Sequence, residues 1–125
     1  TPRNKDFSAE DIRDWHVKGN GWDDIGYHFV VRLNGSIEYG RMVDKYGAHV
    51  KGHNYDSIGI CYVGGMSKDM KEWEDTRTKE QKDSLLLLLK TLKKLHKKAV
   101  IYGHKDFSSK MCPSYDAKEE YKNIK

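Results

Sequence analysis

The sequence has few of the residues that cross-link or interrupt a chain. Its 125 residues include only two cysteines and two prolines, so the composition argues against a disulfide-dense scaffold and a proline-rich linker. No apolar run approaches the roughly 20 residues that a membrane-spanning helix needs. The first residues do not show the charged segment, apolar segment and small-residue cleavage site that make up a secretory signal. The 37% hydrophobic content instead fits one globular domain with a buried core.

A strong charge of one sign is also lacking. The chain has 23 Lys and Arg against 19 Asp and Glu, a net charge of +4, which gives a mild attraction to anionic partners. The lysine pairs at 93–94 and 97–98 fall on a predicted helix, and no nucleic-acid-binding motif occurs. We therefore expect no nucleic-acid partner.

Capping signatures and hydrophobic periodicity predict the helices. Ser8-Ala9-Glu10-Asp11 predicts a helix that runs to about Lys18 and ends at Gly19-Asn20-Gly21. Thr78-Lys79-Glu80-Gln81 predicts a second helix to about Lys98, and Pro113-Ser114 a short last one to about Lys122. The second helix should bury a stripe of leucines at helical spacing. These are Leu85, Leu88, Leu89, Leu92 and Leu95, widened by Leu86 and Leu87.

Apolar stretches predict the strands. Residues 27–32 are β-branched and aromatic and lead into Asn34-Gly35, a strong hairpin signal, so residues 36–40 should return antiparallel. The near-continuous apolar run at 57–63 predicts a strand at the centre of the sheet. A further run at 99–103 predicts another buried strand. The order of these elements predicts an α/β fold, a mixed central sheet flanked by helices.

A loop near the C-terminus contains candidate metal ligands. The predicted strand at 99–103 would deliver His104 to its C-terminal end, where α/β folds usually place their chemistry. Cys112 follows after one loop, and an imidazole and a thiolate suit zinc, which takes N and S ligands. Lys110 is a cation beside them that could stabilise an oxyanion. On spacing alone, such a pair is more often a surface histidine and a small buried cysteine than a metal site.

The segment 41–56 is rich in Gly, His and Lys without periodicity and predicts a loop. Long loops in compact domains tend to be functional, although solvation explains polar loop residues equally well. His16 on the first helix is interpreted as a packed or partly exposed helix residue. Cys61, inside an apolar run, is interpreted as a free buried thiol.

Ordered motifs over nearly the whole chain resemble one family. They are GWDDIGYHFVVRLNGSIEYGR, GAHVKGHNYDSIGICYVGG, the leucine-rich segment and GHKDFSSKMCPSYD. Their order is similar to that in the zinc-dependent N-acetylmuramoyl-L-alanine amidases, which include small phage amidase-lysozymes and peptidoglycan recognition proteins. The resemblance implies Zn²⁺ as cofactor, His104 and Cys112 as its ligands, Lys110 as oxyanion stabiliser and Tyr27 beside the metal. It also implies that His49 and Asn54 line the substrate groove.

The resemblance implies hydrolysis of peptidoglycan between the lactyl group of N-acetylmuramic acid and L-alanine. The alternative is a peptidoglycan-binding module of the recognition-protein type that does not cut. Cys112 favours the enzyme, because non-cleaving relatives commonly replace that ligand. The family adds phage RNA polymerase as a partner that the residues do not test. It implies a bacteriolytic phage or prophage endolysin made in the cytoplasm, or a cell-envelope protein if a leader was removed.

One departure from the family concerns the third ligand. The family takes His, His and Cys, and the first histidine ends a strand expected just before residue 1. We therefore expect residues 1–125 to form a single amidase domain that lacks this strand, with weak zinc binding and little or no amidase activity on its own. A short upstream strand ending in histidine should restore both. His28, His49 and His53 are the alternatives within the chain.

Overall fold

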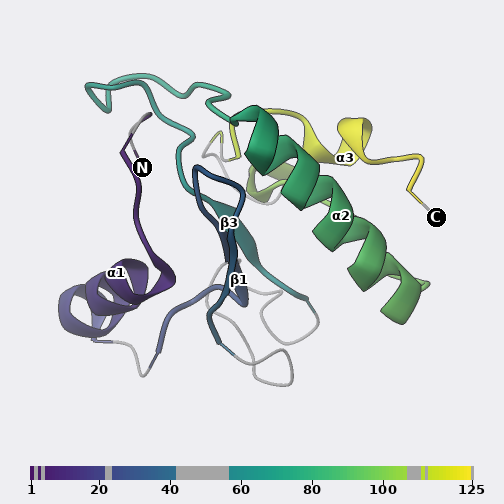
Figure 1. The fold of residues 1–125 in the computed structure, drawn as a ribbon, viewed down its shortest axis with the longest axis horizontal. Helices are drawn as coiled ribbons and strands as arrows, with labels where there is room; N and C mark the ends of the chain where they lie inside the picture. The colour runs from purple at the N-terminus through teal and green to yellow at the C-terminus, as the bar shows by residue number, and fades with distance from the viewer. Residues whose placement is uncertain are drawn as a thin grey trace.

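A mixed three-stranded sheet lies between helices in the computed structural model, which describes residues 1, 3, 5–21, 24–41, 57–106, 111 and 113–124. The strands β1 (Phe29–Val31), β2 (Ile37–Tyr39) and β3 (Ile60–Tyr62) follow the order β2-β1-β3. β1 pairs antiparallel with β2 and parallel with β3. Helix α1 lies on one side of the sheet and α2 on the other (Figure 1). The predicted fold class is confirmed.

Helix α1 (Ala9–Asp14) begins where the capping signature predicts. Ser8 Oγ accepts a hydrogen bond from the Asp11 N–H at 3.1 Å, and the Asp11 carboxylate accepts one from the Ser8 N–H at 2.8 Å. The helix continues as the π-helical turn η1 (Trp15–Gly19). Gly21 then adopts a φ of +70°, which a residue with a Cβ adopts only with strain. The first helix therefore starts and ends as predicted.

Helix α2 (Lys79–Leu95) begins with the second predicted capping box. Thr78 Oγ1 accepts from the Gln81 N–H at 3.0 Å, and Gln81 Oε1 accepts from the Thr78 N–H at 2.9 Å. The fully buried Gln81 also donates through Nε2 to the carbonyl oxygens of Val63 at 2.8 Å and Val31 at 3.3 Å. These bonds attach the start of α2 to the ends of β1 and β3. Within the described part of the chain, no helix is long and apolar enough to cross a membrane.

The leucine stripe of α2 is narrower than predicted. Leu85 and Leu88 are buried and Leu92 packs against them, but Leu95 is 72% exposed and Leu87 is 64% exposed. Leu86 is exposed as well. Successive residues lie about 100° apart around a helix, so residues 86 and 87 point away from the face that contains Leu85. Leu95 is the last residue of α2, where the helix extends past the sheet (Figure 1).

The sheet is buried on both faces by two apolar clusters. In β1, Val30 belongs to the cluster on the α1 side, whereas Phe29 and Val31 belong to the cluster on the α2 side. This alternation follows from the two-residue period of a strand. The buried members of the first cluster are Ala9, Ile12, Ile25, Val30 and Val63. Those of the second are Phe29, Val31, Tyr62, Leu85 and Leu88.

The hairpin between β1 and β2 confirms the Asn34-Gly35 signal. Asn34 Oδ1 accepts from the Ser36 N–H, and Ser36 O accepts from the Arg32 N–H, both at 2.9 Å. Gly35 adopts a φ of +86°, and its carbonyl oxygen accepts a hydrogen bond from Ser84 Oγ on α2. The turn is therefore fixed both within the hairpin and against the helix.

Two of the strand predictions are wrong. Among the described strands β1 is the central one, and β3 from the run 57–63 lies beside it at the edge. Residues 99–103 form no strand, and Val100 and Tyr102 are 61% and 45% exposed. The Ala99 N–H bonds back to the His96 carbonyl oxygen at 2.9 Å, and none of the three described strands pairs with this segment. An apolar run indicates burial but does not specify a pairing partner.

The last helix, α3 (Ala117–Glu120), begins later than the Pro113-Ser114 signal predicts. Ser114 adopts a φ of +73°, which is incompatible with a right-handed helix. The cap is Asp116, whose Oδ1 accepts from the Glu119 N–H at 3.2 Å. The residues after Cys112 in the sequence therefore form a turn before the helix.

Candidate functional site

The structure describes two of the predicted site residues, Tyr27 and His104. The remaining predicted site residues lie outside the described ranges, as does the alternative ligand His53. These residues are Lys110, Cys112, His49 and Asn54. The site is therefore built below from Tyr27, His104 and the described chain neighbours of Cys112.

His104 begins the short 3₁₀ turn η2 (His104–Asp106) and follows an irregular segment, not a strand. The Gly103 N–H donates to Asp106 Oδ2 at 2.8 Å, and the Asp106 N–H donates to Gly103 O at 3.1 Å. Asp106 thus folds the chain back directly after Gly103. His104 is half-buried at the start of this turn.

Gly103 packs directly against Pro113. A Cβ at Gly103 would lie 2.9 Å from Pro113 Cδ and 3.6 Å from its Cγ, a separation that only glycine allows without a shift. Gly103 precedes His104 in the sequence, and Pro113 follows Cys112. The contact therefore joins the chain neighbours of the two predicted ligands. Their imidazole and thiolate donors are the set that zinc prefers.

The Pro113 turn, defined as the described residues 111 and 113–115, is attached to the end of β3. The Tyr62 hydroxyl donates to Pro113 O at 2.5 Å, and Ser114 Oγ donates to Gly65 O at 2.6 Å. Within the turn, the Ser114 N–H donates to Met111 O at 2.7 Å. The sequence did not single out Tyr62 or Gly103. Each lies within or at the end of an apolar run, so both were interpreted as ordinary strand residues.

A buried arginine fixes the segment that follows the Pro113 turn. The Arg77 side chain is 3% exposed and forms ion pairs with Asp75 at 2.8 Å and with Glu120. Its guanidinium carbon lies 3.4 Å from the centre of the Tyr115 ring. Burial acts to lower the Arg77 pKa, but hydrogen bonds to the two carboxylates outweigh it and raise the pKa. Arg77 therefore stays charged and holds α3 beside the start of α2.

Tyr27 is half-buried and lies just before β1. Its carbonyl oxygen accepts from the Arg41 N–H at 2.8 Å, which extends the pairing of β1 with β2. A Cβ at Gly40 would come within 2.3 Å of that oxygen, so glycine is required there. The His16 ring lies 5.8 Å from the Tyr27 ring, centre to centre. The residues just after β2 thus fix the Tyr27 backbone, and His16 lies beside its ring.

Comparison with known proteins identifies the family. A family model described as N-acetylmuramoyl-L-alanine amidase matches residues 2–115. The chain belongs to this amidase family.

Related proteins agree with the family match. The endolysin of Klebsiella phage KP32 is 42% identical over 118 residues, which are 94% of this chain and 77% of the endolysin. The N-acetylmuramoyl-L-alanine amidase LysC from Clostridium intestinale superposes with a TM-score of 0.81 at 28% identity, covering 98% of this chain and 80% of LysC. Bumblebee PGRP-SA superposes with a TM-score of 0.75 at 30% identity over 92% and 67% of the two chains. The resemblance is confirmed, and the chain is an amidase.

The described residues of the amidase contain no group of three His, Cys, Asp or Glu side chains arranged to hold a metal. His28, one of the alternatives for the third ligand, is 1% exposed, and its Nδ1 accepts from the Gly59 N–H at 2.9 Å. A ring whose Nδ1 accepts this bond carries its proton on Nε2, so neither nitrogen offers a lone pair to a metal. His28 therefore has a structural role between β1 and the start of β3.

His16 of the amidase is a packed helix residue, as interpreted from the sequence. Its Nδ1 accepts a hydrogen bond from the Gly26 N–H at 2.8 Å. Burial lowers the His16 pKa, and the positive charge of Arg41 lowers it further. The neutral imidazole is therefore the form that the fold stabilises, since only this form accepts the Gly26 bond.

His16 should make the stability of the amidase depend on pH. Because its folded pKa lies below the unfolded value near 6.5, the unfolded chain binds more protons at mildly acidic pH. The free energy of unfolding should therefore fall as the pH drops from about 7 to 5. Urea unfolding at several pH values measures this effect. The free energy of unfolding should depend less on pH in His16→Asn, whose Oδ1 can accept the Gly26 bond. An equal pH dependence in both proteins would contradict this role.

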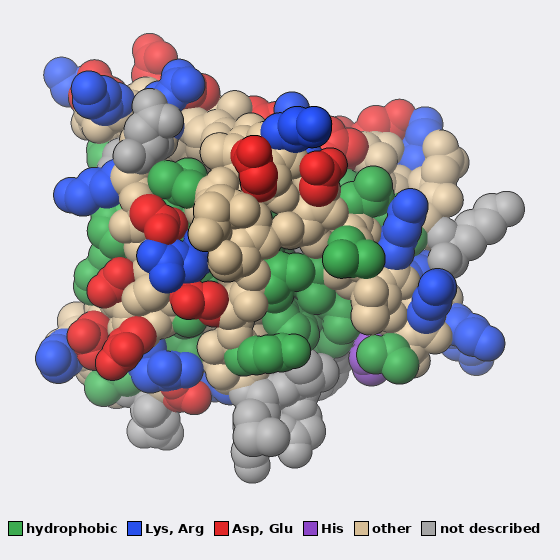
Figure 2. Space-filling model, in the orientation of Figure 1, with side chains coloured by type: hydrophobic (Ala, Val, Ile, Leu, Met, Phe, Trp, Pro, Cys, Tyr) green, Lys and Arg blue, Asp and Glu red, His purple; other side chains and the backbone are tan. Residues whose placement is uncertain are grey.

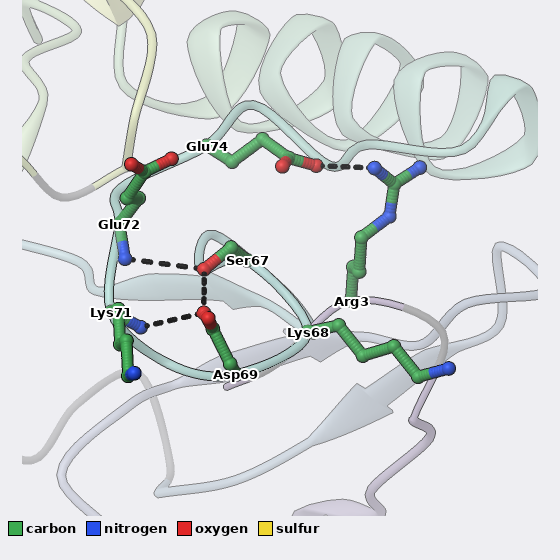
Figure 3. Close-up of a pocket in the computed structure, with 7 residues that line it drawn as sticks. All are labelled: Arg3, Ser67, Lys68, Asp69, Lys71, Glu72 and Glu74. Atoms are coloured by element: carbon green, nitrogen blue, oxygen red, sulfur yellow. Dashed lines mark hydrogen bonds and ion pairs between the residues drawn. The ribbon is translucent and has the colours of Figure 1, made fainter.

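A surface pocket of the amidase is lined by Arg3 and by residues of the turn at 67–74 (Figure 3). Asp69 Oδ1 accepts from Ser67 Oγ at 2.7 Å and from the Lys71 N–H at 3.1 Å. Arg3, which also lines the pocket, forms an ion pair with Glu74 at 2.7 Å. Ser67 is thus paired with Asp69 and Arg3 with Glu74, and neither Tyr27 nor His104 lines the pocket. We assign no catalytic role to it.

Proposed function

We propose that this chain is a zinc-dependent amidase that hydrolyses the amide between the lactyl group of N-acetylmuramic acid and L-alanine in peptidoglycan. The observation that carries the proposal is the contact between Gly103 and Pro113, because these residues adjoin His104 and Cys112. Membership of the amidase family and the likeness to a phage endolysin support the reaction. Residues 1–125 would form one bacteriolytic amidase domain.

His104 and Cys112 would hold the zinc ion through an imidazole nitrogen and a thiolate. When bound, zinc supplies a Lewis acid that lowers the pKa of water and polarises a carbonyl group. The third ligand remains a prediction, with His49 and His53 as alternatives to a histidine upstream. Zinc competes with protons for the cysteine sulfur, so its affinity should rise with pH.

Lys110 and Tyr27 would act on the reacting carbonyl. As the water oxygen bonds to the carbonyl carbon, negative charge develops on the carbonyl oxygen, and the Lys110 ammonium would stabilise it. The Tyr27 hydroxyl would donate a hydrogen bond to that oxygen or accept one from the water. The carbon–nitrogen bond then breaks, and the alanine nitrogen leaves with a proton as a free amine. A lysine and a phenol each need a strongly lowered pKa to act as the base, so neither is assigned that role.

Substrate recognition would fall to His49 and Asn54, which we propose line the groove for the glycan and the stem peptide. The alternative from the sequence, a peptidoglycan-binding module that does not cut, has only the likeness to PGRP-SA in its favour. Cys112 favours the enzyme, because a module that only binds has no need of a thiolate ligand. Production in the cytoplasm as a phage or prophage endolysin, and binding to phage RNA polymerase, stay predictions.

Lys110→Ala and Tyr27→Phe should each slow hydrolysis of purified cell wall by on the order of a hundredfold, because each removes one charge-stabilising group. Neither residue is assigned as a ligand, so zinc content should stay unchanged. Tyr39→Phe is the matched control, since it deletes the same hydroxyl from a 79% exposed side chain on β2. Loss of zinc from either variant would refute its assigned role, and full activity in both would refute the proposed site.

A further inference from the structure

The Pro113 turn is held between two parts of the fold that are far apart in the sequence. On one side, Pro113 packs against Gly103. On the other, Pro113 O and Ser114 Oγ bond to Tyr62 and Gly65, at and just after the end of β3. Turn residues that carry ligands reach their required positions only when rigid elements support them. β3 is such an element, because its backbone is paired with β1.

Tyr62 is well suited to position this turn. Its side chain is 7% exposed and belongs to the cluster with Leu85 and Leu88, so packing fixes the ring. The hydroxyl extends from that cluster to Pro113 O at 2.5 Å, a short hydrogen bond. The bond joins residues that are 51 positions apart in the sequence. An ordinary core aromatic residue would supply the packing without this directed bond.

The proline transmits the restraint to its neighbour. A proline ring locks φ near −65°, which ties the preceding peptide group to the position of the ring. Pro113 has no N–H, and its carbonyl oxygen is its backbone hydrogen-bonding group. The Gly103 contact fixes the ring, and the Tyr62 hydroxyl fixes the carbonyl. Together they fix Pro113, the residue that follows Cys112 in the sequence.

We propose that the Tyr62 hydroxyl is a positioning group for the metal site, which orients the Cys112 ligand by holding Pro113 O. The inference rests on the proposed function, since it assumes that Cys112 binds zinc. Groups that orient metal ligands without binding the metal typically contribute about 10-fold to 100-fold in metal affinity. Tyr62 acts one residue away from the ligand, so we expect about a 10-fold effect.

Tyr62→Phe tests the inference, because it keeps the buried ring and removes only the hydroxyl. We expect zinc affinity, measured by competition with a chromogenic chelator, to fall about 10-fold. In the cobalt-substituted protein, the thiolate-to-metal charge-transfer band should shift or weaken. A loss of stability alone would leave this band of the folded protein unchanged. The matched control Tyr39→Phe should leave both unchanged, since Tyr39 is exposed on β2.

Equal zinc affinity and an equal cobalt spectrum in Tyr62→Phe and the unaltered chain would overturn the inference. If Tyr62→Phe fails to fold, Ser114→Ala removes the parallel bond to Gly65 and should weaken zinc binding in the same direction. A Ser114→Ala protein with unchanged affinity would then overturn it. Failure of the proposed function would look different, because Cys112→Ser would then bind zinc as tightly as the unaltered chain.

Discussion

Replacing Cys112 by serine should abolish amide hydrolysis and remove most of the bound zinc. A serine hydroxyl is far less acidic than a thiol and is a harder ligand, so it competes poorly for zinc at neutral pH. Loss of a supporting partner alone costs about 10-fold to 100-fold in metal affinity or activity, and loss of a ligand should exceed that. Metal content by mass spectrometry and hydrolysis of purified cell wall, each with excess zinc supplied, measure the two effects.

Cys61→Ser is the matched control for this experiment. Cys61 is half-buried on β3, where its Sγ lies 3.5 Å from Tyr62 O, and we assign it no ligand role. The same atom replacement at Cys61 should therefore leave zinc content and hydrolysis close to those of the unaltered chain. One equivalent of zinc and normal turnover in Cys112→Ser would show that the ligand assignment is wrong.

Replacing Arg77 by methionine should destabilise the fold by about 3 kcal/mol, at the lower end of the cost of breaking a buried ion pair. Arg77 is the nearly buried centre of a network with Asp75 and Glu120, whereas the two carboxylates are partly exposed and can regain water. Methionine keeps much of the contact with the Tyr115 ring, so the loss reports mainly the charge. The melting temperature should fall by about 10 °C.

Arg3→Met provides the comparison for a surface pair. Arg3 and Glu74 form their ion pair with both side chains exposed, and such pairs contribute at most about 1 kcal/mol. Urea unfolding of both variants measures the difference. If Arg77→Met costs no more than Arg3→Met, the buried network does not stabilise the attachment of α3.

Elements specified by neighbouring residues were predictable from the sequence. The caps of α1 and α2 and the Asn34-Gly35 hairpin depend on hydrogen bonds between residues two to four positions apart. The structure confirms all three.

On the face shown in Figure 2, apolar side chains gather near the middle, with acidic and basic ones interspersed around them, in keeping with the small net charge.

Features that depend on distant contacts were not predictable from periodicity. The run at 99–103 is apolar enough for a strand but pairs with none of the described strands, and Leu95 continues the helical pattern beyond the sheet that would bury it. At the site, the family motifs supplied the candidate residues, while the contacts of Pro113 with Gly103 and Tyr62 emerge only in three dimensions. The hydrophobic pattern alone does not specify such contacts between distant residues.

The central claim is tested most directly by the chemical groups that the protein releases from purified peptidoglycan. We predict that the chain, preceded by a short strand that ends in histidine and supplied with zinc, releases new amino-terminal alanine without new reducing sugar ends, and that a chelator stops the release. His104→Ala should release neither group, because it lacks a predicted ligand. New reducing ends, or alanine release that continues in the chelator and in His104→Ala, would contradict a zinc-dependent amidase at this site.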